Sequence, residues 1–319
     1  MHLIIDNYAV KIEVEDEQFK ICNEDNIRLV SALRLSSINL LKPCVITTSA
    51  LVLAAKNQVP VLIYNHIGDV EAWLWSPQYG TIASLRRNQI YFTESTDGLQ
   101  WINELLSEKT QAQISNLKWL ANRVETHANA INNTIQKIQQ IQKNYTELDI
   151  EKLRAKEGYI AREYWSQLAE CLTKYTNFTN RENRNAEQTF NRYINYAYGI
   201  LYGIVESSLL MTGVDPYMGI LHIDRYDKPV MAFDHIEPFR PWIDKLVIEL
   251  FMQEKITDND IETDEQNKEI LLLSKRKLLI DTFFTFMNEK AQLNSKRYKR
   301  IDHIHYLSQQ LANRIKAYK

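Results

Sequence analysis

The side chains best suited to chemistry lie in one stretch, 213–241, which reads GVDPYMGILHIDRYDKPVMAFDHIEPFRP. It contains His222 and then two acids, Asp234 and Glu237, which are spaced so that a helical turn would place both carboxylates on one face. One histidine and two acids from different segments are a typical ligand set for a divalent cation. A buried histidine bonded to a structural carboxylate would give the same pattern, and it is the commoner arrangement.

A third acid, Glu157, lies upstream in the segment KEGYIAREYW. Taken alone, it is best explained as a solvated helix residue that pairs with Lys156 or Arg162. His303 and His305 would diverge on a helix, so they make poor joint ligands and we expect both at the surface. The sequence shows no P-loop, no dinucleotide-binding glycine fingerprint, no G-x-S-x-G elbow and no cysteine–histidine signature.

The composition is that of an ordinary globular chain of 319 residues, with 45% hydrophobic and 24% charged residues. The net charge of -2 neither requires nor excludes nucleic acid, because local patches matter more than the sum. The three cysteines are far apart and form no C-x-x-C pair, which favours reduced thiols and a cytoplasmic location. We expect no signal peptide and no segment that spans a membrane.

The elements that position these residues change in character along the chain. Short β-branched and aromatic runs before residue 76 predict strands, with one helix over 49–58 capped by Thr47 or Thr48. From residue 82 the periodicity is helical, and it predicts helices over 99–108, 115–144 and 190–210, the last ended by Gly213. We therefore predict an α+β protein, with a small β-rich, sandwich-like domain over 1–80 and a larger all-α domain over 81–319.

Two patterns in the helical part concern surfaces. Isoleucines recur at helical spacing from Ile131 to Ile141, and we expect this stripe to be a packing face rather than a binding groove. The C-terminal region is basic, with tyrosines interleaved, and such a region can contact phosphates. A solvated basic helix face is slightly favoured by the sequence alone. The cations that would form the contact are Lys296, Arg297, Lys299 and Arg300.

Three blocks of this chain, in this order, resemble the CRISPR-associated spacer-acquisition integrase family, also called the universal CRISPR endonuclease. The blocks are EGYIAREYW, NRYINYAYGILYG and the 213–241 stretch, with D-P-Y-x-G-x-L-H followed by D-x-x-E-x-F-R-P as the most specific part. The β-rich start and larger helical part also match, so the resemblance covers nearly the whole chain. It implies a metal-dependent DNA endonuclease and integrase of CRISPR adaptation, which inserts short DNA fragments into the CRISPR repeat array.

The resemblance also implies a site. The family holds Mg²⁺ or Mn²⁺ with a glutamate, a histidine and a second acid, which fall here on Glu157, His222 and Glu237. Asp234 is the accompanying acid, either beside these ligands or as an occasional ligand. Whether His222 only binds metal or also transfers a proton stays open.

The resemblance implies three partners. These are double-stranded DNA, a second copy of the chain joined through the β domains, and a small CRISPR-associated adaptation subunit. We expect Arg162, Arg225 and Arg240 to contact DNA phosphates. Two other functions remain: a general metal-dependent nuclease acting on branched DNA, and a non-catalytic architectural DNA-binding protein whose acids are structural.

Overall fold

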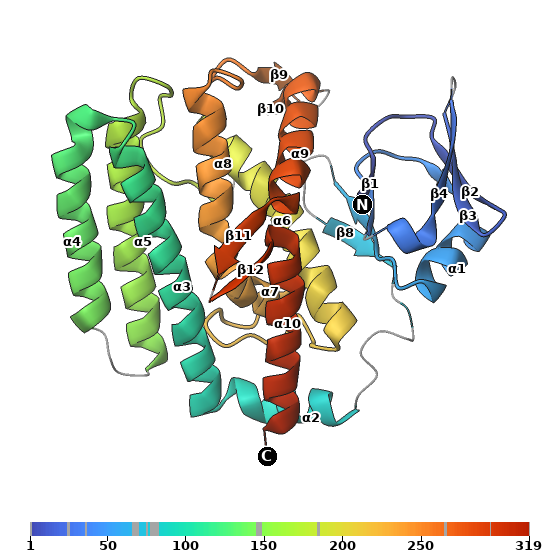
Figure 1. Ribbon diagram of the computed structural model, residues 1–319, viewed down its shortest axis with the longest axis horizontal. Coiled ribbons are helices and arrows are strands. Elements are labelled where there is room, and N and C mark those ends of the chain that lie inside the picture. Colours follow the sequence, from blue (N-terminus) through green and yellow to red (C-terminus); the bar gives the residue numbers. More distant parts are fainter. Residues whose placement is uncertain are drawn as a thin grey trace.

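The computed structural model describes residues 2–23, 26–35, 37–65, 70–74, 76, 83–144, 149–183, 186–264, 267–293 and 295–318. Strands dominate before residue 74 and helices dominate after residue 83 (Figure 1), which confirms the predicted α+β class. The predicted domain boundary between residues 80 and 81 lies outside the described residues.

The N-terminal part contains two four-stranded sheets. One has the order β1-β5-β7-β8, in which only the last pair is antiparallel. Its strands are β1 (His2–Ile5), β5 (Ser37–Leu40), β7 (Val61–Tyr64) and β8 (Val70–Trp73). The other has the order β4-β3-β2-β6, formed by β4 (Ile27–Ser31), β3 (Gln18–Cys22), β2 (Lys11–Glu15) and β6 (Val45–Ile46). The side chains of Ile12, Phe19 and Ile38 are fully buried in the core of this part.

One α-helix, α1 (Thr48–Lys56), accompanies these sheets, after the short 3-10 turn η1 (Ala32–Arg34). Thr47 caps α1, because its hydroxyl accepts a hydrogen bond from Ala50 N at 3.3 Å. This confirms the predicted helix and one of its two candidate caps.

The larger part is a helical assembly. Its helices are α2 (Ala83–Thr93), α3 (Thr96–Ala121), α4 (Ala128–Asn144), α5 (Ile150–Leu172), α6 (Thr189–Thr212), α7 (Val230–His235), α8 (Arg240–Met252), α9 (Leu273–Asn288) and α10 (Arg300–Ala317), with 3-10 turns η2 (Glu125–His127) and η3 (Glu237–Phe239). Helices α3, α4 and α5 form a layer at one side (Figure 1), while α6 and α10 run through the middle. Two hairpins that the periodicity did not predict are β9 (Ile261–Thr263) with β10 (Glu269–Leu271), and β11 (Lys290–Leu293) with β12 (Lys296–Lys299).

The isoleucine stripe forms a packing face, as predicted. Ile131, Ile135 and Ile138 are buried where α4 packs against α3 and α5. The predicted single helix over 115–144 is wrong, because the chain turns back between Ala121 and Ala128. A continuous helix would have left the stripe in water, whereas the turn buries it. Gly213 ends α6 with φ 87°, in the left-handed region, which confirms its predicted role.

The two parts touch along α6. A β-carbon at Gly203 would lie 2.6 Å from the Tyr64 hydroxyl and 2.7 Å from Val70 Cγ2, so only glycine allows α6 to approach the sheet this closely. Lys277 on α9 adds an ion pair with Asp6 at 3.4 Å. In the part of the chain that the structure describes, no helix has both the length and the apolar character that crossing a membrane requires.

Candidate active site

Two of the predicted ligands meet around a lysine that the sequence analysis did not single out. Lys109, on α3, places its Nζ 2.5 Å from Glu157 Oε1 and 2.6 Å from Glu237 Oε2. Glu157 lies on α5, and Glu237 begins the 3-10 turn before α8. The Lys109 and Glu237 side chains are 8% and 3% exposed, whereas that of Glu157 is 29% exposed. The cluster is therefore closed on the Glu237 side and open to solvent on the Glu157 side.

Glu237 has a second cation. Its Oε1 lies 3.0 Å from Arg240 Nη1, and Arg240 also donates a hydrogen bond to the Tyr202 hydroxyl. The guanidinium lies over the rings of Tyr198 and Tyr202, at 5.4 and 5.7 Å from their centroids. Burial opposes ionisation of Glu237, but Arg240 and Lys109 outweigh it and hold the pKa of this carboxyl below its usual value.

Asp234 organises the loop that carries His222. Its buried carboxylate accepts hydrogen bonds from Ile220 N at 2.6 Å, Leu221 N at 2.9 Å and His222 N at 3.0 Å. The Nδ1 atom of His222 lies 2.6 Å from Asp234 Oδ1. An ionised carboxylate can only accept, so Nδ1 carries the proton and Nε2 keeps its lone pair. Asp234 thus commits both oxygens to the loop and fixes the tautomer of His222.

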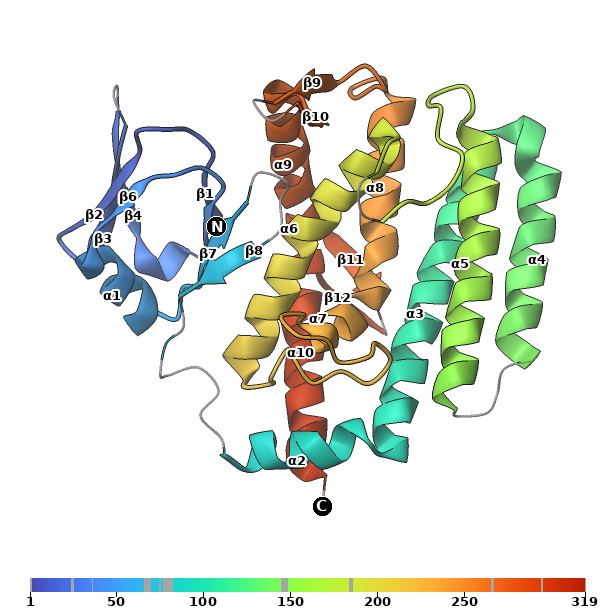
Figure 2. The same ribbon diagram turned by 180° about the vertical axis from the view of Figure 1, so that it is seen from behind.

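A second anchor ties this loop to the helix of Glu157. Arg154 Nε, one turn before Glu157 on α5, donates a hydrogen bond to Leu221 O at 2.7 Å. The loop between α6 and α7 runs beside α3 (Figure 2), and it is held there by Asp234 of α7 and Arg154 of α5. The His222 side chain is 38% exposed, and its ring is near enough to Glu237 that a protonated His222 would lower the pKa of that carboxyl. All three predicted ligands therefore surround one region.

The donor atoms suit Mg²⁺ or Mn²⁺, which prefer carboxylate oxygens and accept an imidazole nitrogen. Among the described residues, no three His, Cys, Asp or Glu side chains already converge as a metal cluster. Lys109 lies between the two carboxylates instead. Glu237 Oε2 is buried and receives no hydrogen bond of good geometry, although the ammonium is 2.6 Å away. A buried oxygen left in this way fits a ligand for a cation.

The predicted phosphate-contacting arginines have different surroundings. Arg162 is exposed on α5 beside Tyr159, and Arg225 is exposed in the His222 loop. Arg240 instead uses its guanidinium to hold Glu237. Next to Arg225, Tyr226 is 93% exposed at the tip of a β-turn that is closed by the Lys228 N–Arg225 O hydrogen bond of 3.2 Å.

The predicted basic cluster forms the second strand of the β11–β12 hairpin. Lys296, Arg297 and Lys299 are exposed on β12, and Lys296 Nζ lies 4.1 Å from the centroid of the Tyr306 ring. Arg300 is separate from them, because its side chain is only 14% exposed and donates hydrogen bonds to Phe286 O and Glu289. The hairpin, and not a helix face, presents these cations.

The expectation that His303 lies at the surface is wrong. His303 is buried, and its Nε2 lies 2.9 Å from Ala291 O and 3.2 Å from Tyr298 N. Nε2 either donates to Ala291 O or accepts from Tyr298 N, depending on the tautomer, and either bond fastens the β11–β12 hairpin to α10.

Three residues of the site were missed from the sequence: Lys109, Arg154 and Tyr202. Lys109 did leave a signal, because it occupies a core position of α3 in the buried series with Leu105, Leu106 and Ile114. A charged residue within the apolar face of an amphipathic helix indicates a buried partner of opposite charge.

Comparisons with known proteins agree with this architecture. The family model described as CRISPR associated protein Cas1 matches residues 3–285. The CRISPR-associated protein Cas1 3 of Methanobrevibacter ruminantium is 31% identical over 291 residues, covering 88% of this chain and 86% of the relative. The CRISPR-associated endonuclease Cas1 1 of Francisella tularensis subsp. novicida is 25% identical over 307 residues, covering 95% and 92%.

Solved structures share the fold. A casposase bound to its integration product superposes with a TM-score of 0.79 at 19% identity, covering 100% of this chain and 91% of the casposase. A chain of a Cas6-RT-Cas1–Cas2 complex gives a TM-score of 0.76 at 20% identity, covering 99% of this chain and 35% of that longer chain. Together with the family match over residues 3–285, these likenesses show that the chain belongs to the Cas1 family of CRISPR-associated proteins.

Proposed function

We propose that this chain is the metal-dependent DNA endonuclease and integrase of CRISPR adaptation, which joins short DNA fragments to the CRISPR repeat. The observation that carries the proposal is the Glu157–Glu237 pair beside a histidine whose tautomer Asp234 fixes, in a chain of the Cas1 family. Relatives named endonucleases, and a similar fold bound to an integration product, support it.

The reaction is an in-line displacement at phosphorus. The 3′-hydroxyl of the fragment loses its proton and forms a new P–O bond, while the bond to the 3′-oxygen of the target strand breaks and that oxygen gains a proton. Glu157, Glu237 and Nε2 of His222 would hold Mg²⁺ or Mn²⁺. The bound cation would stabilise negative charge on the attacking and leaving oxygens. Asp234 keeps Nε2 of His222 free of its proton, either for the cation or to accept a proton.

The DNA would lie over the exposed cations around this opening. Arg162 and Arg225 are exposed on the two segments that carry Glu157 and His222, while the exposed cations of β12 form a separate positive segment. Such contacts follow the backbone and not the base sequence, so they suit an enzyme that accepts fragments of any sequence.

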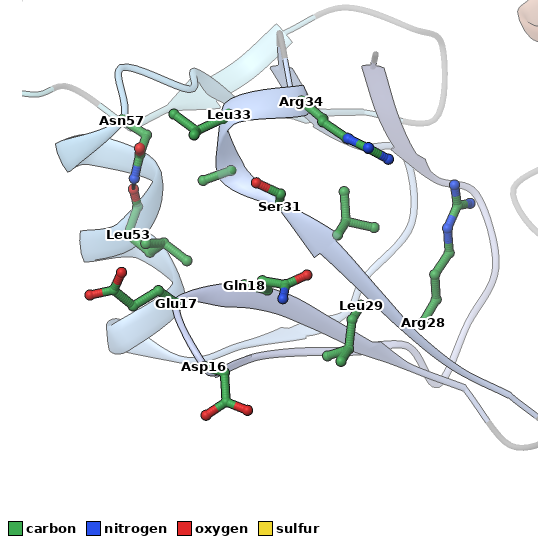
Figure 3. Close-up of a pocket in the computed structure, with 12 residues that line it drawn as sticks. Asp16, Glu17, Gln18, Arg28, Leu29, Ser31, Leu33, Arg34, Leu53 and Asn57 are labelled. Atoms are coloured by element: carbon green, nitrogen blue, oxygen red, sulfur yellow. Dashed lines mark hydrogen bonds between the residues drawn. The ribbon is translucent and has the colours of Figure 1, made fainter.

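A second copy of the chain would dock on the N-terminal sheets. Strand β4 is an edge strand whose Ile27 and Leu29 are exposed, and Leu33 just beyond it is 89% exposed. Leu29 and Leu33 line an open cleft of about 700 Å³ with Arg28, Arg34, Asp16 and Glu17 around them (Figure 3). An unpaired edge with apolar and oppositely charged groups suits a self-complementary interface. The Cas1–Cas2 complex with a similar chain supports a small adaptation subunit as a further partner.

The experiment that tests the proposal is strand transfer of a short duplex into a supercoiled plasmid bearing a CRISPR repeat. It is run with Mn²⁺, with and without the small subunit, and with His222→Ala after circular dichroism has shown a normal fold. We expect products that need metal, His222 and the small subunit. Metal-dependent cutting that ignores the repeat and the subunit would favour the general nuclease. A folded protein that binds DNA but shows no turnover with any metal would favour the architectural function.

A further inference from the structure

The charges at the carboxylate pair already balance without a divalent cation. Glu157 and Glu237 supply two negative charges, and Lys109 and Arg240 supply two positive charges within ion-pair distance. A divalent cation entering this cluster would meet two fixed positive charges at close range, in a region where burial weakens screening by water. Binding between the carboxylates therefore requires one of the two cations to leave.

Arg240 is the cation that stays. It bonds to Glu237 Oε1 and to the Tyr202 hydroxyl, and it lies over two aromatic rings, so several contacts fix its planar group. Lys109 is held differently. Among the described residues, its ammonium contacts the two carboxylates and no third acceptor. Its flexible four-carbon stem allows the ammonium to move without moving α3.

We propose that Lys109 is a built-in cation that holds Glu157 and Glu237 together in the metal-free protein and is displaced by the incoming divalent cation. The ammonium leaves toward the Glu157 side, because Glu157 is 29% exposed while Glu237 is 3% exposed. Metal binding then adds a mobile positive charge to the opening where DNA would lie. This inference rests on the proposed function, since it assumes that the carboxylates bind metal.

The first test measures binding of Mn²⁺ alone, by titration calorimetry without DNA, to the parent protein and to Lys109→Met. If the ammonium blocks the site most of the time, removing it lowers the Kd for Mn²⁺ by about tenfold or more. The metal-free variant should also melt at a lower temperature than the parent, with Mn²⁺ restoring the difference, because two carboxylates lose their counterion. A lysine with only a structural role would not tighten metal binding.

The matched control is Lys156→Met. Lys156 is also buried and lies next to Glu157, but its Nζ lies 3.3 Å from Asn103 Oδ1, and no ion pair to a carboxylate is present among the described residues. Its substitution should leave the Kd for Mn²⁺ unchanged.

A second test uses the parent protein, so it does not depend on the variant folding. Reductive methylation followed by peptide mass spectrometry measures the reactivity of each lysine with and without saturating Mg²⁺. Lys109 should be protected without the cation and become several-fold more reactive with it, while Lys156 stays protected. If the parent binds no divalent cation, the proposed metal site itself is wrong. If it binds one, and Lys109→Met binds no more tightly and Lys109 stays protected, the displacement is wrong and the metal site stands.

Discussion

Two buried polar clusters meet at α7, and they are built in opposite ways. Asp234 turns toward the His222 loop, while the next residue, His235, turns into the core, where its ring stacks at 5.7 Å on Trp101. Nε2 of His235 lies 3.0 Å from Ser308 Oγ, which lies 2.9 Å from Ser208 Oγ. The carboxylate cluster is ionic and open on one side, whereas the histidine–serine cluster is neutral and closed.

The difference separates a site from a scaffold. Burial lowers the pKa of His235 to about 3, so this imidazole is uncharged at neutral pH and needs no counterion. Its Nε2 pairs with the Ser308 hydroxyl, while its Nδ1 has no hydrogen-bond partner among the described residues. Glu237 is as deeply buried, yet it stays ionised because two cations hold it so. The buried charge of Glu237 is thus balanced by two cations, whereas His235 is held by a neutral hydrogen bond.

The largest expected effect is from Glu157→Gln. It keeps the shape of the side chain but removes a charge that the reaction requires, so strand transfer should fall by about a thousandfold or more while folding is retained. Single-turnover strand transfer with Mn²⁺ measures it. Glu163→Gln, on the same helix and paired with Lys137, is the control that should keep parental rates.

Asp234→Asn should slow strand transfer by about 10- to 100-fold. If the asparagine oxygen keeps the bonds from Ile220 N and Leu221 N, its amide faces Nδ1 of His222 and moves the ring proton to Nε2. Rates in Mn²⁺, together with the ¹⁵N chemical shifts of the ring that report the tautomer, check it. An unchanged tautomer with parental rates would contradict the role given to Asp234.

Ser308→Ala should cost about 1–2 kcal/mol in the free energy of unfolding and leave strand transfer per folded molecule unchanged. Ser308 Oγ is within hydrogen-bond distance of His235, Ser208 and Ile304 O, so its loss leaves buried groups unpaired. Urea denaturation measures the stability. A loss of activity without a loss of stability would show that the second cluster is more than a scaffold.

The smallest expected effect is on pH dependence. Because the folded pKa of His235 lies near 3, below its ordinary value of 6.5, the unfolded chain takes up a proton that the folded chain does not. The stability that neutral His235 contributes is present above pH 6.5 and is lost as the pH falls toward 3. His235→Phe, which keeps the ring contact with Trp101, should lose about 1 kcal/mol less than the parent between pH 7 and 5.5, by urea denaturation. An equal loss in both proteins would contradict this.

The sequence allowed the local parts of the fold to be predicted. The α4 stripe, the Thr47 cap and the Gly213 end each depend on residues within one or two turns, and all three are confirmed. The turn between α3 and α4 was missed because no glycine or proline marks it, and only the packing of α4 on α5 requires it.

The candidate site was also predictable in part: its residue types could be read from the sequence, but their contacts could not. The residue types at Glu157, His222 and Glu237 could be recognised from their motifs. The sequence of α3 could show that Lys109 is buried, but not which acids it pairs with, because α3 and α5 meet only in the folded protein. The four hydrogen-bond donors of Asp234 were likewise hidden, since three of them are backbone groups whose directions no residue type encodes.

Gly203 lies where α6 connects the β-rich part of the molecule with the candidate active site. On α6 it lies directly after Tyr202. Gly203 packs against the sheet, and the Tyr202 hydroxyl accepts a hydrogen bond from Arg240. The contact leaves no space for a side chain at position 203, because even a methyl group would collide with Tyr64 and Val70. The same stretch of α6 therefore joins the β-rich part, through Gly203, to the arginine that pairs with Glu237, through Tyr202.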